Sequence, residues 1–240
     1  MRYIKKTICF LMVFTFVLCC FGQEVVNSMP YMVNDTLFIK KDSVQSIFID
    51  KTKNSKYYSI SNITFAEIEN NEIYKQNFEF LKTQKIKLKN HKIDNKLPQK
   101  WTPLYLYNGE YYIYYPNYPC DYWAYRLCFI TDSTFVDAWA TDVMVDAILE
   151  YKKIKNNIFQ FNVAYLSTFQ NRKITFYLID KKRGIAILRD ENGEGSGDFL
   201  MVDADKAKNF PVIVNECDNG KMFQLDFQKP NFEELINKQK

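Results

Sequence analysis

Four aspartates between two predicted strands are the best candidates for acid–base chemistry: Asp132, Asp137, Asp142 and Asp146. Two facing carboxyl groups can hydrolyse a glycosidic bond, one of them acting as the acid. Asp137 alternates with Phe135 and Trp139, so one face of its strand carries an acid between two aromatic rings. That pattern favours sugar binding, although an edge strand protected by a charge has the same pattern. Asp137 and Asp142 are the predicted catalytic residues of a carboxylate-dependent glycan hydrolase, which we keep as an alternative function.

A glycine-rich stretch places oxygen ligands along one turn, at Asp190, Asn192, Glu194 and Asp198. Such ligands suit a hard cation such as Ca²⁺. However, Met201 stands where an EF-hand loop needs its bidentate glutamate, and the flanking residues are typical of strands. The main interpretation is a solvated hairpin loop, and a weak metal site is the alternative. No glycine pattern that cradles phosphate is present, and we predict no cofactor.

Histidine and cysteine usage narrows the chemistry further. His91 is the only histidine and lies among Lys and Asn, which is typical of a solvated surface residue. A Ser-His-Asp or Cys-His site would have to use it. Beyond the N-terminal region three cysteines remain, Cys120, Cys128 and Cys217, which allow at most one disulfide in any of three pairings. Small buried apolar cysteines are an equally good interpretation.

Aromatic residues are densest between Trp101 and Tyr125. Tyr and Trp combine a large apolar face with a polar tip, which suits ligand clefts and protein interfaces. Both faces of the predicted hairpin there are aromatic, so one face needs a cover, a ligand or a partner. Packing of tyrosines in the core is the competing interpretation. The predicted ligand-binding residues are Tyr105, Tyr107, Tyr112, Tyr114, Tyr118, Tyr122, Trp123 and Trp139.

The N-terminus predicts export. Basic residues precede an apolar run from Thr7 to Leu18, which is the layout of a secretory signal and shorter than the roughly 20 residues of a membrane-spanning helix. We expect a signal peptide over 1–22, with cleavage before Gln23, and a periplasmic, envelope-associated or secreted protein. Acylation at Cys19 or Cys20 is the lipoprotein alternative.

The charge balance excludes two classes of partner. The chain has 32 basic and 28 acidic residues, and three of the basic ones lie in the predicted signal. The rest is therefore close to neutral, whereas binders of nucleic acid or anionic membranes concentrate basic residues. No later segment has the length and hydropathy of a transmembrane helix.

The elements that must position these residues are mainly strands. Asn108-Gly109 supports a type I′ turn and predicts a hairpin over 104–115. Thr64 and Glu67 form a capping-box pattern that starts a helix over about 65–82, which a polar connection over 82–100 follows. Short strands are expected near 37–39, 47–49, 125–130, 133–139, 146–154, 158–165, 173–180, 185–190, 198–203, 210–216 and 222–228, and a short helix over 232–238.

This spacing predicts a mainly β protein in which an antiparallel meander forms a barrel or sandwich. Of these, we expect a lipocalin-like architecture. An N-terminal strand–helix segment over 23–100 precedes a meander domain over 101–240, which a short C-terminal helix closes. We predict an exported, non-catalytic protein that binds a small apolar molecule, a glycan or a protein through its Tyr/Trp residues. A structural component of the cell envelope is the third function considered.

Overall fold

The computed structural model describes residues 30–33, 36–84, 86–116, 126–139, 142–164, 171–192, 196–218 and 223–239. Several predictions concern residues outside these ranges. They are the signal peptide over 1–22, acylation at Cys19 or Cys20, the disulfide candidate Cys120, and the site residues Tyr118, Tyr122, Trp123 and Glu194.

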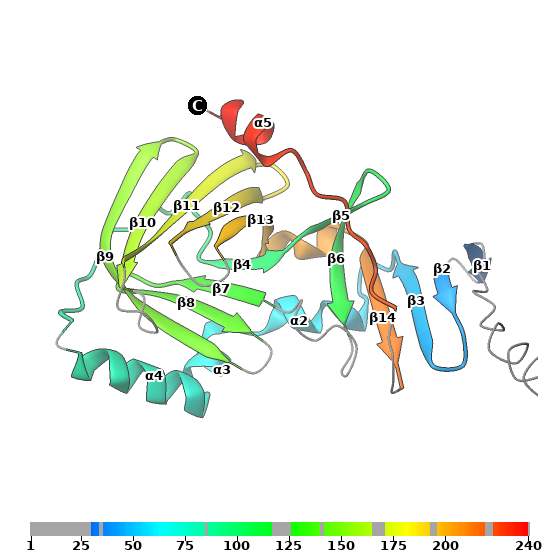
Figure 1. Ribbon diagram of the computed structural model, residues 1–240, viewed down its shortest axis with the longest axis horizontal. Coiled ribbons are helices and arrows are strands. Elements are labelled where there is room, and N and C mark those ends of the chain that lie inside the picture. Colours follow the sequence, from blue (N-terminus) through cyan, green and yellow to red (C-terminus); the bar gives the residue numbers. More distant parts are fainter. Residues whose placement is uncertain are drawn as a thin grey trace, which may run out of the picture.

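Eight antiparallel strands of the described chain close into a barrel (Figure 1). Each barrel strand pairs with the next one along the chain, and β13 closes the ring on β4, which is the up-and-down arrangement. The predicted antiparallel meander is thus confirmed, as a barrel and not a sandwich. The barrel strands are β4 (Lys100–Pro103), β7 (Arg126–Ile130), β8 (Thr134–Trp139), β9 (Val143–Lys155), β10 (Ile158–Ala164), β11 (Asn171–Asp180), β12 (Ile185–Glu191) and β13 (Gly197–Asp203).

A second sheet packs beside the barrel (Figure 1). Its strand order is β1 (Tyr31–Val33), β2 (Thr36–Lys41), β3 (Gln45–Asp50), β14 (Val212–Cys217), β6 (Glu110–Pro116) and β5 (Tyr105–Tyr107). Only β14 and β6 run parallel among its described pairs. The predicted hairpin therefore forms, as β5 and β6, but it leaves the barrel after β4 and joins strands from the N-terminal third.

Short helices complete the fold: η1 (Lys56–Tyr58), α2 (Ser59–Asn62), α3 (Phe65–Glu69), α4 (Glu72–Thr83), η3 (Ala204–Asn209) and α5 (Phe232–Asn237). The capping box at Thr64 is present. The single helix expected over 65–82 is wrong, because Asn71 leaves the helical conformation and accepts a hydrogen bond from the Ile73 N–H as a new N-cap. No helix in the described ranges has the length and hydropathy to cross a membrane.

Side chains fill the barrel interior over most of its length. Trp101, Phe135, Phe159, Phe161 and Phe176 are fully buried there, with ring centroids of Trp101 and Phe176 5.1 Å apart. An eight-stranded barrel has an interior just wide enough for such filling. A ligand of this barrel must therefore bind near an end and not in the middle.

The connection over 86–99 closes the barrel end formed by the turns after β7 and β9. Its Leu97 is buried against the interior cluster, and the His91 N–H donates to the carbonyl of Asp132. The imidazole Nε2 of His91 lies 3.0 Å from the carbonyl oxygen of Ile148. The expectation of a solvated His91 is wrong, because the connection is packed onto the barrel and the half-buried ring contacts its backbone.

The C-terminal segment covers the second aromatic face of the hairpin. The strand expected over 222–228 does not form in its described part, where Gln228 makes a single bridge to Leu106. Instead Phe227 packs with its ring centroid 4.5 Å from that of Tyr105 and 5.0 Å from that of Tyr114. In Figure 1 this segment is the red chain that runs along the second sheet to α5.

The turn at Asn108-Gly109 generates the first prediction. Both residues have positive φ, 48° and 78°, as a type I′ turn requires. Gly109→Ala should lower the free energy of unfolding by about 1 kcal/mol, because a side chain strains that conformation although no atom lies within 4 Å of the added Cβ. Asn108→Gly is the control and should change it by less than about 0.5 kcal/mol. Urea unfolding checks both, and equal stability of Gly109→Ala and the natural protein would contradict the turn.

Candidate functional site

Five charged side chains lie inside the barrel, at the end opposite to the connection over 86–99. Each is no more than 4% exposed, and each comes from the last or first residues of its strand near that end. They share the inward-facing register of the buried apolar residues in β7, β8, β9, β11 and β12. We call this set the charged cluster: Arg126, Asp137, Asp146, Arg172 and Asp190.

Arg172 is the centre of the charged cluster. Its Nε and Nη2 donate to the two carboxylate oxygens of Asp190 at 2.8 and 2.6 Å. Nη2 also donates to Asp137 at 2.6 Å, and Nη1 donates to Asp146 at 3.1 Å. One guanidinium therefore ties together three strands that are not all neighbours, with the planar geometry that makes Arg–carboxylate pairs strong.

Arg126 is the second cation of the cluster. Its Nε and Nη2 both lie 2.9 Å from Oδ1 of Asp137, and the Cys128 thiol donates to the same oxygen at 3.1 Å. Burial alone would raise the pKa of Asp137, but the guanidinium groups of Arg126 and Arg172 outweigh it and lower the pKa to about 2. Burial raises the pKa of the Cys128 thiol, which makes it a poor nucleophile.

The charged cluster offers little support for acid–base catalysis. Asp137 is held as a carboxylate by hydrogen bonds to both of its oxygens, so it is badly placed to donate a proton. Asp142, the other residue of the predicted catalytic pair, is exposed before β9. The hydrolase alternative stays a prediction for which we find no favourable geometry.

Arg126 connects the charged cluster to a cavity. Its guanidinium carbon lies 5.0 Å from the ring centroid of Trp139 and 4.5 Å from that of Phe199, so the cation is held between two rings. On the outer side of these groups is a cavity of about 370 Å³, which we call the mouth cavity. Its walls come from the ends of β4, β5 and β13 and from the C-terminal segment, with these lining residues: Pro103, Leu104, Tyr105, Leu106, Arg126, Trp139, Asp198, Phe199, Leu200, Met201, Phe227, Gln228, Lys229, Pro230 and Phe232.

The indole N–H of Trp139 is a buried donor without a partner in the described part of the chain. Among the described residues it is the only buried side-chain nitrogen or oxygen without a hydrogen-bond partner. Leaving such a donor unpaired costs about 1–3 kcal/mol.

An ion-pair clamp fixes the outer wall of the mouth cavity. Arg189 donates from Nε and Nη2 to the carboxylate of Asp198 at 2.7 and 2.9 Å, and also to Glu233 of α5. Gln228 is held from both sides, since its N–H donates to the Leu106 carbonyl and its side-chain oxygen accepts from the Gly109 N–H. The C-terminal segment is thereby fastened over the cavity.

The structure brings two of the predicted ligand-binding residues together, Tyr105 and Trp139, at the mouth cavity. Tyr112 and Tyr114 are buried in the second sheet, and the ring of Phe227 packs against that of Tyr114. Tyr107 is half-buried next to Tyr112, with ring centroids 6.2 Å apart. The hydroxyl of Tyr112 contacts Glu110, and burial with this contact raises the pKa of Tyr112 to about 12.

Two of the predicted metal ligands are paired with arginines instead. Asp190 belongs to the charged cluster, and Asp198 is paired with Arg189. Asn192 has a positive φ of 70°, which fits the hairpin turn that was the main interpretation. No group of three or more His, Cys, Asp or Glu side chains in the described ranges is arranged to hold a metal ion. Cys217 is disulfide-bonded, and Cys128 is free and buried.

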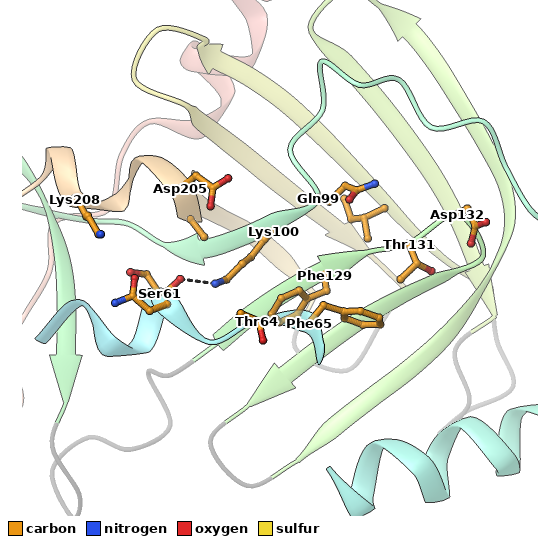
Figure 2. Close-up of a pocket in the computed structure, with 13 residues that line it drawn as sticks. Ser61, Thr64, Phe65, Gln99, Lys100, Phe129, Thr131, Asp132, Asp205 and Lys208 are labelled. Carbon is orange, nitrogen blue, oxygen red and sulfur yellow. Dashed lines mark hydrogen bonds between the residues drawn. The ribbon is translucent and has the colours of Figure 1, made fainter. Parts of the chain in front are cut away.

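A larger hollow, of about 730 Å³, lies at the junction between the barrel, α2, α3 and η3 (Figure 2). Lys100 extends across it and donates to the Ser61 carbonyl, with its Nζ 5.8 Å from the ring centroid of Phe129. Burial lowers the pKa of Lys100. Opposite charges line the hollow, from Lys100 and Lys208 to Asp132 and Asp205, and most of its polar side chains are exposed. It is therefore a more polar site than the mouth cavity.

Sequence reasoning singled out Asp137 and missed its arginine partners. The sequence did contain a signal, because side chains alternate between the two faces of a strand. Arg126 is on the same face of its strand as the buried Ile130, and Arg172 is on the same face as the buried Phe176. A charged residue in the apolar phase of a strand needs a buried partner. Two such arginines and three such aspartates on neighbouring strands therefore indicate a network.

The charged cluster predicts a large effect of Arg172→Met. Removal of this cation leaves carboxylates buried without a counter-charge, so the free energy of unfolding at pH 7 should fall by about 3–5 kcal/mol. Arg183→Met is the matched control, because Arg183 pairs with Asp180 at an exposed position and should contribute less than about 1 kcal/mol. Urea unfolding measures both variants, and similar losses for the two would contradict a structural role of the cluster.

The lowered pKa of Asp137 predicts a pH dependence of stability. A folded pKa of about 2, below the ordinary aspartate pKa of 3.8, stabilises the protein above pH 4, and this contribution disappears as the pH falls toward 2. It amounts to about 2 kcal/mol. We expect the stability difference between the natural protein and Asp137→Asn to shrink by that amount between pH 5 and about pH 2. A difference that stays constant over this range would show that Asp137 is not held ionised.

The chain matches no protein-family model, no curated protein and no solved structure at a significant level. No activity can thus be transferred to it from a relative, and a fold alone does not indicate a function. The function has to be inferred from the chemistry of the mouth cavity and the charged cluster.

Proposed function

We propose that this protein is an exported, non-catalytic binding protein that holds a small, mainly apolar molecule in the mouth cavity. The observation that carries the proposal is a mainly apolar cavity whose lining includes Trp139, a residue with a buried, unpaired indole N–H. Pockets of about 300–1,000 Å³ with apolar walls and few polar groups are typical of small-molecule sites. At about 370 Å³ the mouth cavity suits a ligand at the small end of that range.

The walls support binding more than turnover. Apolar surface comes from three separate segments of the chain, with Leu104 and Leu106 at the hairpin, Leu200 in β13, and Phe227 and Phe232 in the C-terminal segment. The acidic groups nearest to it are already engaged, Asp137 with two arginines and Asp198 with Arg189. A carboxylate held in this way stabilises a cation and does not transfer protons.

The predicted export signal supports placing this activity outside the cytoplasm. A basic segment and a short apolar run precede the first described residue, and a disulfide at Cys217 fits an oxidising compartment. A binding protein of the cell envelope combines these features with the mouth cavity. Recovery of the protein from the cytoplasm with its first residues intact would contradict this localisation.

Binding of the neutral fluorophore N-phenyl-1-naphthylamine tests the proposal. The protein should bind it with increased fluorescence, and Leu106→Asp should weaken binding at least about tenfold, because it places a carboxylate in the apolar wall. Ile154→Asp is the matched control, since Ile154 is an exposed apolar residue far from the cavity. Circular dichroism confirms that both variants fold. Saturable binding that Leu106→Asp does not weaken would place the fluorophore elsewhere and overturn the proposal.

A further inference from the structure

Two neighbouring donors in the mouth cavity specify the ligand further, and this inference rests on the proposed function. The Trp139 N–H has no acceptor among the described residues. Arg126 bonds to Asp137 through Nε and Nη2, whereas its Nη1 makes no hydrogen bond within the described chain. Both side chains line the mouth cavity, and the guanidinium carbon lies 5.0 Å from the Trp139 ring centroid, so the two donor groups are neighbours there. A bound molecule must therefore offer a hydrogen-bond acceptor at this point.

The charges around the two donors determine whether the site favours an ionised or a neutral acceptor. In the charged cluster two guanidinium groups face three carboxyl groups, so no positive charge is in excess. At the outer wall Arg189 is shared between two further carboxylates, those of Asp198 and Glu233. The remaining cation of the lining is Lys229, which is exposed to water. An ionised ligand group would lose its hydration here without gaining a counter-charge.

A neutral acceptor meets both conditions. The carbonyl oxygen of an amide, ester or ketone accepts hydrogen bonds and carries no charge that must be desolvated. The positive end of the Arg126–Asp137 pair faces such an oxygen, which strengthens the hydrogen bond. The rest of the ligand lies against leucine, methionine and phenylalanine side chains and is therefore aliphatic or aromatic.

We infer that the mouth cavity binds small amphipathic molecules that present a neutral carbonyl to Trp139 and Arg126, and that it discriminates against the corresponding carboxylates. The selectivity is set by the charge balance of the cluster behind Arg126. Trp139 and Arg126 orient the carbonyl, and the leucine and phenylalanine walls accept the apolar body.

Calorimetric titration with three ligands of equal chain length tests this inference: octanamide, octanoate and octylamine. At pH 7.5 octanamide should bind at least about tenfold more tightly than octanoate or octylamine, because only it is a neutral acceptor. Trp139→Phe keeps the ring and removes the N–H, and it should weaken octanamide about fivefold or more. Tyr111→Phe, at a half-buried ring beside Arg183, is the control and should leave octanamide unchanged.

The outcomes separate this inference from the proposed function. Octanoate that binds as tightly as octanamide, or a Trp139→Phe variant with unchanged octanamide affinity, would overturn the neutral-carbonyl inference while the binding function stands. A protein that binds neither N-phenyl-1-naphthylamine nor any of the three octyl compounds would overturn both. Fluorescence of the folded variants provides the check that substitution at Trp139 has left the barrel intact.

Discussion

The pairing of Arg172 and Arg126 with three aspartates is the interaction on which the rest of the molecule depends. A barrel interior contains no bulk water, so charges there are tolerated only when they are paired and hydrogen-bonded. The carboxylates of β8, β9 and β12 meet the guanidinium groups of β7 and β11, and together they join the ends of these strands. Such a network fixes which strands face each other, a specificity that apolar packing alone supplies less strictly.

The same network determines what the barrel end can do. Because Asp137 holds Arg126 from inside, the guanidinium is kept beside the rings of Trp139 and Phe199 and forms part of the cavity wall. Asp137 neutralises the charge of Arg126 by pairing with its Nε and Nη2, and Nη1 is left to donate a hydrogen bond to a ligand. The interior charges thus act on a ligand indirectly, through the orientation and effective charge of one side chain.

Much of the fold could be predicted from the sequence, because it is determined locally. Asn108-Gly109, the capping box at Thr64 and the alternation in β10 and β11 each depend on neighbouring residues, and all were confirmed. The pairing of β14 with β3 and β6, by contrast, joins residues at least 99 positions apart in the sequence, and no local pattern specifies it. The candidate site has the same limit. Tyr105 and Trp139 were expected to bind a ligand, but Arg126 beside them is placed by carboxylates of two other strands, Asp137 of β8 and Asp190 of β12.

The filled interior explains why a ligand site lies at the end of this barrel. Trp101 and four phenylalanines occupy the middle, and the connection over 86–99 closes the far end. The C-terminal segment then extends the opposite end outward, since Phe227 and Phe232 continue the apolar wall beyond the strand ends of β4 and β13. The cavity is therefore assembled from the barrel, the hairpin and the C-terminal segment together. Phe227 also packs on Tyr105 and Tyr114. These aromatic contacts therefore form part of the core of the second sheet, and Tyr105 and Phe227 also line the cavity.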